Sequence, residues 1–273
     1  MATREYQGIK YRAGSEEPIL DSLTIEEALQ ININGKAFTV TMRTPGDDLS
    51  LIRGLLHSEG IIKHSSFSPE ILLSKENKQG VVSIADVIIP EKELGEGYSN
   101  SRSLLSVSSC GICGRTELEE LGFSGVVESN EQIDASIIPS LFTKMNTFQK
   151  DFHQSGGTHA AAAFDIHGKL LCSLEDIGRH NAVDKVIGSL INSNKIKAAF
   201  CMTVSGRISY EIIIKSFKAK IPVLSAVSAP SSLSVDYAKE LGVTLFAFCR
   251  ENRSTCYSHT QRVKNILLKK EAS

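Results

Sequence analysis

The sequence predicts a mixed α/β fold, and three observations support it. In the C-terminal half, short apolar stretches of β character alternate with helix-like stretches, which is typical of a partly parallel sheet with helices packed on it. Residues 1–100 are instead rich in strand-like stretches. The chain has 273 residues and a hydrophobic fraction of 41%, so a core can be buried; without Trp it must be mainly aliphatic.

The N-terminal part begins with clear strand and helix signals. Ala37–Met42 and Gly80–Ile89 are short apolar stretches with β character. Between them, Asp47–Ser58 carries Leu and Ile residues on one helical face, and Asp47 or Asp48 can cap its start. We therefore expect two strands separated by one amphipathic helix.

A polar segment, Glu91–Ser109, is rich in Ser, Gly and Asn and predicts a loop that leads to Cys110. Beyond it, Pro139–Gln154 shows apolar residues at helical spacing and predicts one helix. Thr158–Asp165 and Lys169–Leu174 predict a hairpin.

The alternation of helices and strands follows that hairpin. The expected helices are Asn181–Asn192, Ile208–Ala219 and Ser231–Leu241, and the expected strands are Ala198–Val204, Pro222–Val227 and Val243–Cys249. We expect three parts: a strand-rich N-terminal subdomain (1–100), a Cys-bearing loop with the helix after it (101–138), and an α/β domain (139–273).

Composition excludes some classes of function. With 30 basic and 31 acidic residues, the net charge of −1 leaves no basic field to hold nucleic acid. The N-terminus shows no apolar signal region, and no apolar run approaches the roughly 18 residues of a membrane span. We expect a cytoplasmic protein without nucleic-acid or membrane partners.

The sequence has six cysteines, but only Cys110 and Cys113 form a motif. A glycine follows each of them, which gives an open loop, and Arg115 and a following helix start supply positive potential. Both effects lower a thiol pKa. A thiolate can attack a persulfide sulfur and become a persulfide itself, as in disulfide exchange.

Other interpretations of this pair stay open. A lone CxxC in a reducing compartment is also typical of a redox pair or of half a zinc site. In addition, His57-Ser58-Glu59 upstream resembles part of the zinc deaminase pattern, although Ser109 stands where that pattern has Pro. A zinc-dependent, deaminase-like hydrolase is therefore the alternative function.

Anion sites are predicted where strands end. Ser205-Gly206-Arg207 lies between a predicted strand and a predicted helix, where backbone N–H groups and an Arg can hold phosphate. Phe248-Cys249-Arg250-Glu251-Asn252-Arg253 follows the last strand, at the edge where α/β proteins bind ligands. Two other polar strings are also compatible with structural roles: Glu175–Asn181 can cap the helix at Asn181, and His159 in Gly156–His159 can be a hydrogen-bonded structural histidine.

Together these strings resemble the formate dehydrogenase accessory sulfurtransferase family. The resemblance spans roughly residues 35–260 and rests on five strings in order. These strings are Ser108–Gly114, Gly156–Ala161, Glu175–Lys185, Ser205–Glu211 and Phe248–Arg253.

The resemblance implies a function that spacing alone does not. Family members accept sulfur from a cysteine desulfurase and pass it to the molybdenum bis(molybdopterin guanine dinucleotide) cofactor, which makes formate dehydrogenase active. It implies that Cys110 and Cys113 carry the persulfide and that the chain forms a homodimer. It also implies a cytidine deaminase-like three-layer core, without the zinc motif, so no tightly bound metal of its own is expected.

Family resemblance also suggests where the guanine nucleotide cofactor binds. The matching residues are Phe248, Cys249, Arg250, Glu251, Asn252 and Arg253, with Gly206 and Arg207 as further candidates.

Overall fold

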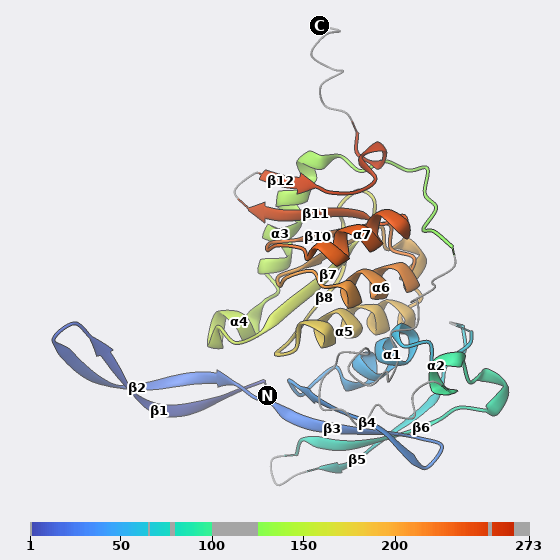
Figure 1. The fold of residues 1–273 in the computed structure, drawn as a ribbon. Coiled ribbons are helices and arrows are strands. Elements are labelled where there is room, and N and C mark those ends of the chain that lie inside the picture. Colours follow the sequence, from blue (N-terminus) through green and yellow to red (C-terminus); the bar gives the residue numbers. More distant parts are fainter. Residues whose placement is uncertain (1, 65, 77–79, 100–124, 251–252, 265–273) are drawn as a thin grey trace, which may run out of the picture.

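The computed structural model describes residues 2–64, 66–76, 80–99, 125–250 and 253–264 (Figure 1). It confirms the predicted α/β fold, with a strand-rich N-terminal part followed by a three-layer C-terminal core. The N-terminal elements are β1 (Thr3–Arg12), β2 (Ser15–Thr24), β3 (Glu27–Ile33), β4 (Lys36–Arg43), α1 (Asp48–Ser58), β5 (Glu70–Glu76), β6 (Val82–Ile88), the 3₁₀ helix η1 (Glu91–Glu93) and α2 (Glu96–Ser99).

Strands β1 and β2 form a two-stranded antiparallel arm that extends away from the rest of the molecule (Figure 1). Only the base of the arm meets the body, where the hydroxyls of Thr24 and Ser155 lie 2.6 Å apart. Ile9, Tyr11 and Leu20, further along the arm, are each more than half exposed. The arm was not predicted, because its strands pair without burying an apolar face and therefore lack an alternating pattern.

The N-terminal sheet has the order β4-β3-β6-β5, and α1 packs on it. Leu29, Ile31 and Ile33 alternate along β3 and are fully buried, which places them under α1. The two strands and the helix predicted in this part are confirmed, and β3 and β5 are additional strands in the same sheet.

The predicted cap of α1 is wrong. Asp47 stands at the N-cap position with a left-handed backbone (φ 55°), and its side chain accepts no capping bond. The carboxylate of Asp48 instead accepts hydrogen bonds from Nε (2.8 Å) and Nη2 (3.2 Å) of Arg43, whose side chain is fully buried. Leaving a buried guanidinium without a charged partner costs more free energy than leaving the first turn of a helix without a side-chain cap.

The loop predicted over Glu91–Ser109 is also wrong in its first part, where η1 and α2 lie. A Cβ at Gly95 or Gly97 would lie 2.2 Å from the carbonyl oxygen of Gly60 or 2.0 Å from that of Glu59, respectively. These glycines therefore serve close backbone packing, although they resemble loop residues in the sequence. The remainder of that segment, from residue 100, lies outside the described residues.

The C-terminal elements follow in this order: η2 (Ala135–Ile137), α3 (Ile138–Asn146), α4 (Lys150–Ser155), β7 (His159–Phe164), β8 (Leu170–Asp176), α5 (Arg179–Asn192), η3 (Ile196–Ala198), β9 (Cys201–Val204), α6 (Tyr210–Lys218), β10 (Val223–Ala226), α7 (Ser232–Glu240), β11 (Thr244–Arg250), β12 (Arg253–Cys256) and η4 (Thr260–Arg262). Their sheet has the order β12-β11-β10-β9-β7-β8, in which β9, β10 and β11 are parallel.

Two apolar layers enclose this sheet. Helices α5, α6 and α7 pack on one face, where Ala161, Met202 and Leu224 belong to their cluster. Helix α3 covers the other face through Leu141 and Met145. The predicted hairpin and the alternating helices and strands are confirmed, with bounds shifted by at most three residues.

The single helix predicted over Pro139–Gln154 is instead two helices, α3 and α4. The chain leaves helical geometry at Gln149 (φ −84°, ψ 61°), and α4 begins directly after it. The carboxylate of Glu175 accepts hydrogen bonds from the amides of Asp151 (3.0 Å) and Phe152 (2.9 Å). This carboxylate provides the second helix start, which periodicity within residues 139–154 cannot reveal.

Helices α1 and α5 join the two parts of the molecule backbone to backbone. A Cβ at Gly54 would lie 1.9 Å from the carbonyl oxygen of Asp184, and one at Gly188 would lie 1.9 Å from that of Ser50. Only glycine permits this approach at both positions. The N-terminal sheet is thereby held at a fixed place against the C-terminal core.

Candidate functional site

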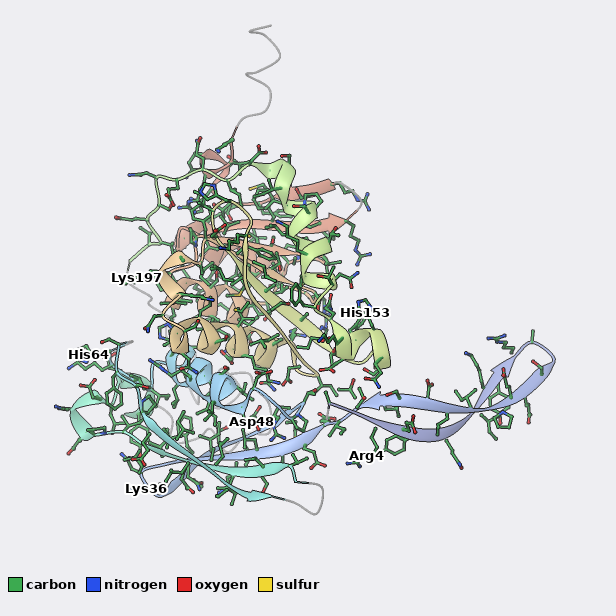
Figure 2. All side chains as sticks on the ribbon, turned by 180° about the vertical axis from the view of Figure 1, so that it is seen from behind. Arg4, Lys36, Asp48, His64, His153 and Lys197 are labelled. Carbon is green, nitrogen blue, oxygen red and sulfur yellow. The ribbon has the colours of Figure 1, made fainter. Side chains whose placement is uncertain are left out.

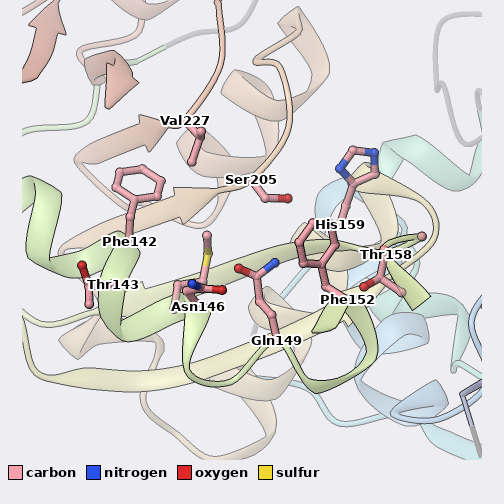
Figure 3. A pocket seen from close by; sticks show the side chains of 12 residues that line it. Phe142, Thr143, Asn146, Gln149, Phe152, Thr158, His159, Ser205 and Val227 are labelled. Carbon is pink, nitrogen blue, oxygen red and sulfur yellow. The ribbon is translucent and has the colours of Figure 1, made fainter. Parts of the chain in front are cut away.

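A cavity of about 570 Å³ lies at the carboxyl edge of the parallel strands, between them and helices α3 and α4 (Figure 3). In α/β sheets this edge is where ligands bind. The lining residues are Phe142, Thr143, Met145, Asn146, Gln149, Phe152, Gly156, Gly157, Thr158, His159, Ser205 and Val227. Its size suits a nucleotide-sized ligand.

His159 opens β7 and lines this cavity (Figure 3). Burial lowers the pKa of His159, and the positive charges of Arg179 and Arg207 lower it further. The imidazole is therefore neutral at pH 7 and can either donate or accept a hydrogen bond. A Cβ at Gly206 would lie 3.3 Å from His159 Nδ1, so the small residue leaves room for the ring.

The turn Ser205-Gly206-Arg207 lies between β9 and α6, as the sequence predicts. The amide of Ala160 donates a hydrogen bond to Ser205 Oγ (2.9 Å), which ties the turn to β7. Gly206 is buried and Arg207 is exposed. Of this turn only Ser205 lines the cavity, while Gly206 packs near His159 and the charge of Arg207 acts on the same imidazole.

Glu175 shapes the opposite wall of the cavity. Besides the two amides of α4, its carboxylate accepts a hydrogen bond from Thr158 Oγ1 (2.7 Å). One carboxylate thus fixes both α4, which carries Phe152, and the Gly156–His159 segment. This long-range clamp joins two of the strings that the sequence analysis treated separately.

The remainder of the Glu175–Lys185 string connects the N-terminal part to the site. Helix α5 starts at Arg179, with Gly178 at the N-cap, so Asn181 is inside the helix. Asn181 Nδ2 donates to the carbonyl of Met42 (2.8 Å). Asp176 forms a buried ion pair with Lys185 (2.8 Å) and accepts from the amide of Thr44 (3.2 Å).

The predicted segment Phe248–Arg253 begins inside β11, and the end of that strand contacts a residue that lines the same cavity. Arg250 Nε donates a hydrogen bond to the carbonyl of Val227 (3.2 Å), and Val227 lines the cavity. The pairing of β11 with β12 is interrupted between Ala247 and Arg250, and Phe248 has a left-handed backbone (φ 54°). Irregularities of this kind redirect side chains next to binding sites.

The other predicted ligands of this segment lie in different environments. Phe248 is 42% exposed, whereas Cys249 is buried in the cluster under α3. Arg253 is exposed and pairs with Arg250 across the β11–β12 turn. Glu251 and Asn252 lie outside the described residues.

Asn146 and Gln149 are among the cavity residues that were not predicted from the sequence. Their amides stand between the apolar positions of the expected helix and line the cavity with Phe142 and Phe152 (Figure 3). Two amides beside two aromatic rings match the edges and faces of a heterocyclic base. The signal available in the sequence was this interruption of an apolar helix face.

Cys110 and Cys113 also lie outside the described residues. Among the described cysteines, burial raises the pKa of Cys172 to about 11 and that of Cys201 and Cys249 to about 12. Burial also raises the pKa of Cys256. These four thiols are protonated at neutral pH and are therefore poor nucleophiles.

The residues of the alternative zinc pattern have other partners. His57 Nε2 donates to the carbonyl of Lys218 (3.1 Å), and burial lowers the pKa of His57 to about 4. Glu59 lies 3.6 Å from the ammonium of Lys215. Among the residues that the structure describes, no three His, Cys, Asp or Glu side chains gather as metal ligands would.

Within the same described ranges, no helix is both long and apolar enough to cross a membrane.

The fold and this cavity define an α/β protein with a nucleotide-sized pocket at the carboxyl edge of its sheet. The model of the FdhD/NarQ family matches residues 24–264, and the chain belongs to this family.

Curated relatives and a solved structure resemble the chain over most of its length. A sulfur carrier protein FdhD of Picrophilus torridus is 40% identical over 252 residues, covering 90% of this chain and 93% of that protein. The sulfur carrier protein FdhD of Mycobacterium tuberculosis is 37% identical over 253 residues, covering 89% and 92%. A crystal structure described as a formate dehydrogenase accessory protein, from Desulfotalea psychrophila, has a TM-score of 0.76 at 22% identity and covers 97% of this chain and 100% of that one. That structure supports the fold.

Proposed function

We propose that this chain is a cytoplasmic, homodimeric sulfur carrier. A cysteine desulfurase places a persulfide on Cys110 or Cys113, and the chain passes the sulfur to the molybdenum bis(molybdopterin guanine dinucleotide) cofactor required by formate dehydrogenase. The names of the relatives, sulfur carrier proteins, support the carrier role. The described cysteines, with raised thiol pKa values, leave Cys110 and Cys113 as the candidate thiolates.

One observation carries the cofactor end of the proposal. Arg250 bonds the carbonyl of Val227, which lines the same cavity as His159 and Ser205. Three sequence strings far apart in the chain therefore meet at one pocket. Its aromatic and amide lining suits a guanine base, and the guanidinium groups of Arg207 and Arg250 suit phosphates.

The loading step is a thiol–persulfide exchange. The cysteine thiolate of this chain attacks the outer sulfur of the donor persulfide, an S–S bond forms here, and the S–S bond of the donor breaks. The donor cysteine leaves as a thiolate. Because the number of S–S bonds is unchanged, loading needs no oxidant.

Intact-mass spectrometry tests the loading step. After incubation with a cysteine desulfurase and cysteine, we expect a reducible gain of about 32 Da, the mass of one sulfur atom. The gain is lost in Cys110→Ala, in Cys113→Ala or in both, whereas the matched control Cys256→Ala retains it. Loading that survives the double replacement of Cys110 and Cys113 contradicts the proposal.

Nucleotide binding tests the pocket independently. We expect Arg250→Ala to weaken the binding of guanosine diphosphate about tenfold, because a charge-assisted contact to phosphate is lost. Arg12→Ala removes an equal charge from the exposed arm and should leave binding unchanged. Equal affinities of both variants and the unmodified protein, measured by calorimetry, contradict the assignment of the pocket.

A further inference from the structure

A second cavity, of about 560 Å³, lies at the amino edge of the parallel strands, opposite the nucleotide-sized pocket. It is formed where α1, α5 and α6 end, between the N-terminal part and the C-terminal core. Ile62, Ile191, Ile196 and Ala219 give it an apolar floor. His57, Gly60 and four lysines complete the lining, and we call this cavity the lysine pocket; the lysines are Lys63, Lys197, Lys218 and Lys220.

The lysine pocket is strongly basic. Its lining contains no Asp or Glu, and no described carboxylate forms an ion pair with Lys63, Lys197 or Lys220. Two acidic residues adjoin the lining and pair elsewhere: Glu59, next to Gly60, with Lys215 (3.6 Å), and Glu93, whose carbonyl accepts from the amide of Lys63, with His64 (3.0 Å). A local excess of positive charge of this kind, on a chain whose net charge is −1, indicates a negatively charged partner.

The helix ends argue against a phosphate site in the lysine pocket. The C-termini of α1, α5 and α6 meet at the pocket, so the negative ends of three helix dipoles face it. Protein sites for phosphate use helix N-termini and backbone N–H groups, which are the opposite arrangement. Flexible lysines around an apolar floor instead suit carboxylates on the surface of a protein with an apolar side chain among them.

The pocket adjoins the start of the segment that carries Cys110. The amides of Gly95 and Gly97 donate to the carbonyls of Ile61 (2.8 Å) and Gly60 (3.2 Å), and α2 then ends at Ser99. After that segment, the amide of Val127 donates to the carbonyl of Leu241 (2.8 Å), just before β11. The chain therefore enters and leaves the Cys-bearing segment at the same edge of the sheet as the lysine pocket.

Figure 2 shows the same separation across the whole molecule. Lys197 and His64 lie on one side, whereas His153 of α4, beside the nucleotide-sized pocket, lies on the other.

We propose that the lysine pocket docks an acidic surface segment of the protein that donates sulfur to this chain. This inference rests on the proposed function. It places sulfur loading at the amino edge of the sheet and cofactor binding at the carboxyl edge, so donor and cofactor do not compete for one site.

Charge reversal tests the proposal. In Lys197→Glu/Lys220→Glu, the initial rate of persulfide loading by a cysteine desulfurase, measured by intact mass at low salt, should fall at least tenfold. The matched control Lys36→Glu/Lys169→Glu makes the same charge change at two exposed positions, the first residue of β4 and the residue before β8, and should load at the original rate. Loading by inorganic polysulfide, which involves no protein donor, should be equal in all three proteins.

The outcomes separate this proposal from the proposed function. If the unmodified protein gains no sulfur from either source, the carrier function itself is wrong. If desulfurase loading proceeds and the pocket variant loads as fast as the control, the docking proposal is wrong. Inhibition of loading by millimolar phosphate at constant ionic strength, lost in the pocket variant, would assign the pocket to a small anion and overturn docking.

Discussion

At the scale of single residues, a buried ion pair of the C-terminal core, Asp184 with Lys215, also binds helix α1 of the N-terminal part. Lys215 Nζ donates to both carboxylate oxygens of Asp184 (2.9 and 2.8 Å), and Ser58 Oγ of α1 donates to the same carboxylate (2.8 Å). Burial alone would lower the pKa of Lys215, but the carboxylates of Asp184 and Glu59 raise it above its ordinary value. The ammonium therefore stays charged inside the protein.

Replacing one partner of this pair should be costly. We expect Lys215→Met to lower the free energy of unfolding by about 3–5 kcal/mol, because the carboxylate of Asp184 is left buried without its cation. The double variant Asp184→Leu/Lys215→Met should lose less than the single one. Urea unfolding measures the free energy of unfolding of the single and the double variant, and Lys239→Met, at an exposed position, is the control. A loss below about 1 kcal/mol in Lys215→Met would contradict the prediction.

At the scale of elements, the glycine contact between α1 and α5 fixes the spacing of the two sheets. We expect Gly188→Ala to destabilise the protein by about 1–3 kcal/mol or more, because the added methyl meets the backbone of Ser50. Helix propensity alone predicts the opposite sign, a gain of about 1 kcal/mol. Thermal unfolding distinguishes the destabilisation expected from close packing from the gain expected from helix propensity. Asn192→Ala, at the exposed end of α5, is the control. A raised melting temperature for Gly188→Ala would refute close packing between α1 and α5.

Local patterns predicted the elements whose residues carry a periodic signal. The β7–β8 hairpin and the helices and strands from α5 to β11 follow from alternation of apolar stretches, and their order is confirmed. Strand β3 was missed although Leu29, Ile31 and Ile33 alternate in the sequence. The break between α3 and α4 could not be predicted, because it depends on Glu175, which is distant in sequence from the helix it starts.

The candidate site was predicted in pieces. The strings at Gly156–His159, Ser205–Arg207 and Phe248–Arg253 were each recognised. The structure brings the first string and Ser205 to one cavity, and Arg250 bonds Val227, which lines it. What connects them is the topology of the sheet, which places the ends of β9, β10 and β11 side by side. The roles of Cys110 and Cys113 stay a prediction, since both lie outside the described residues.

At the scale of the whole molecule, His57 lies between the ends of α1 and α6 and makes stability depend on pH. Burial lowers the pKa of His57 to about 4 from the ordinary 6.5, so only the unfolded chain binds a proton on this ring between those pH values. The contribution is therefore fully present above pH 6.5 and is lost as the pH falls toward 4. From pH 7 to pH 5 we expect His57 to cost about 2 kcal/mol of stability.

The variant His57→Gln isolates this effect. It keeps a donor for the carbonyl of Lys218 but cannot take up a proton, so its stability should change less between pH 7 and pH 5 than that of the unmodified protein. His167→Gln, at an exposed turn, should retain the original dependence. Urea midpoints at the two pH values provide the comparison, and parallel losses in all three proteins would rule out His57 as the cause.

The β1–β2 arm has a practical consequence for every binding measurement on this protein. Its tip extends into solvent, but its pairing returns the first residues to the body: the amide of Ile25 donates to the carbonyl of Ala2 (2.8 Å), and Thr3 pairs with Thr24. Thr24 lies against Gly157, at the wall of the nucleotide-sized pocket. A purification tag fused before Ala2 would therefore emerge beside the pocket mouth and compete with ligands for that space, whereas a tag inserted at Gly14, on the tip, would not.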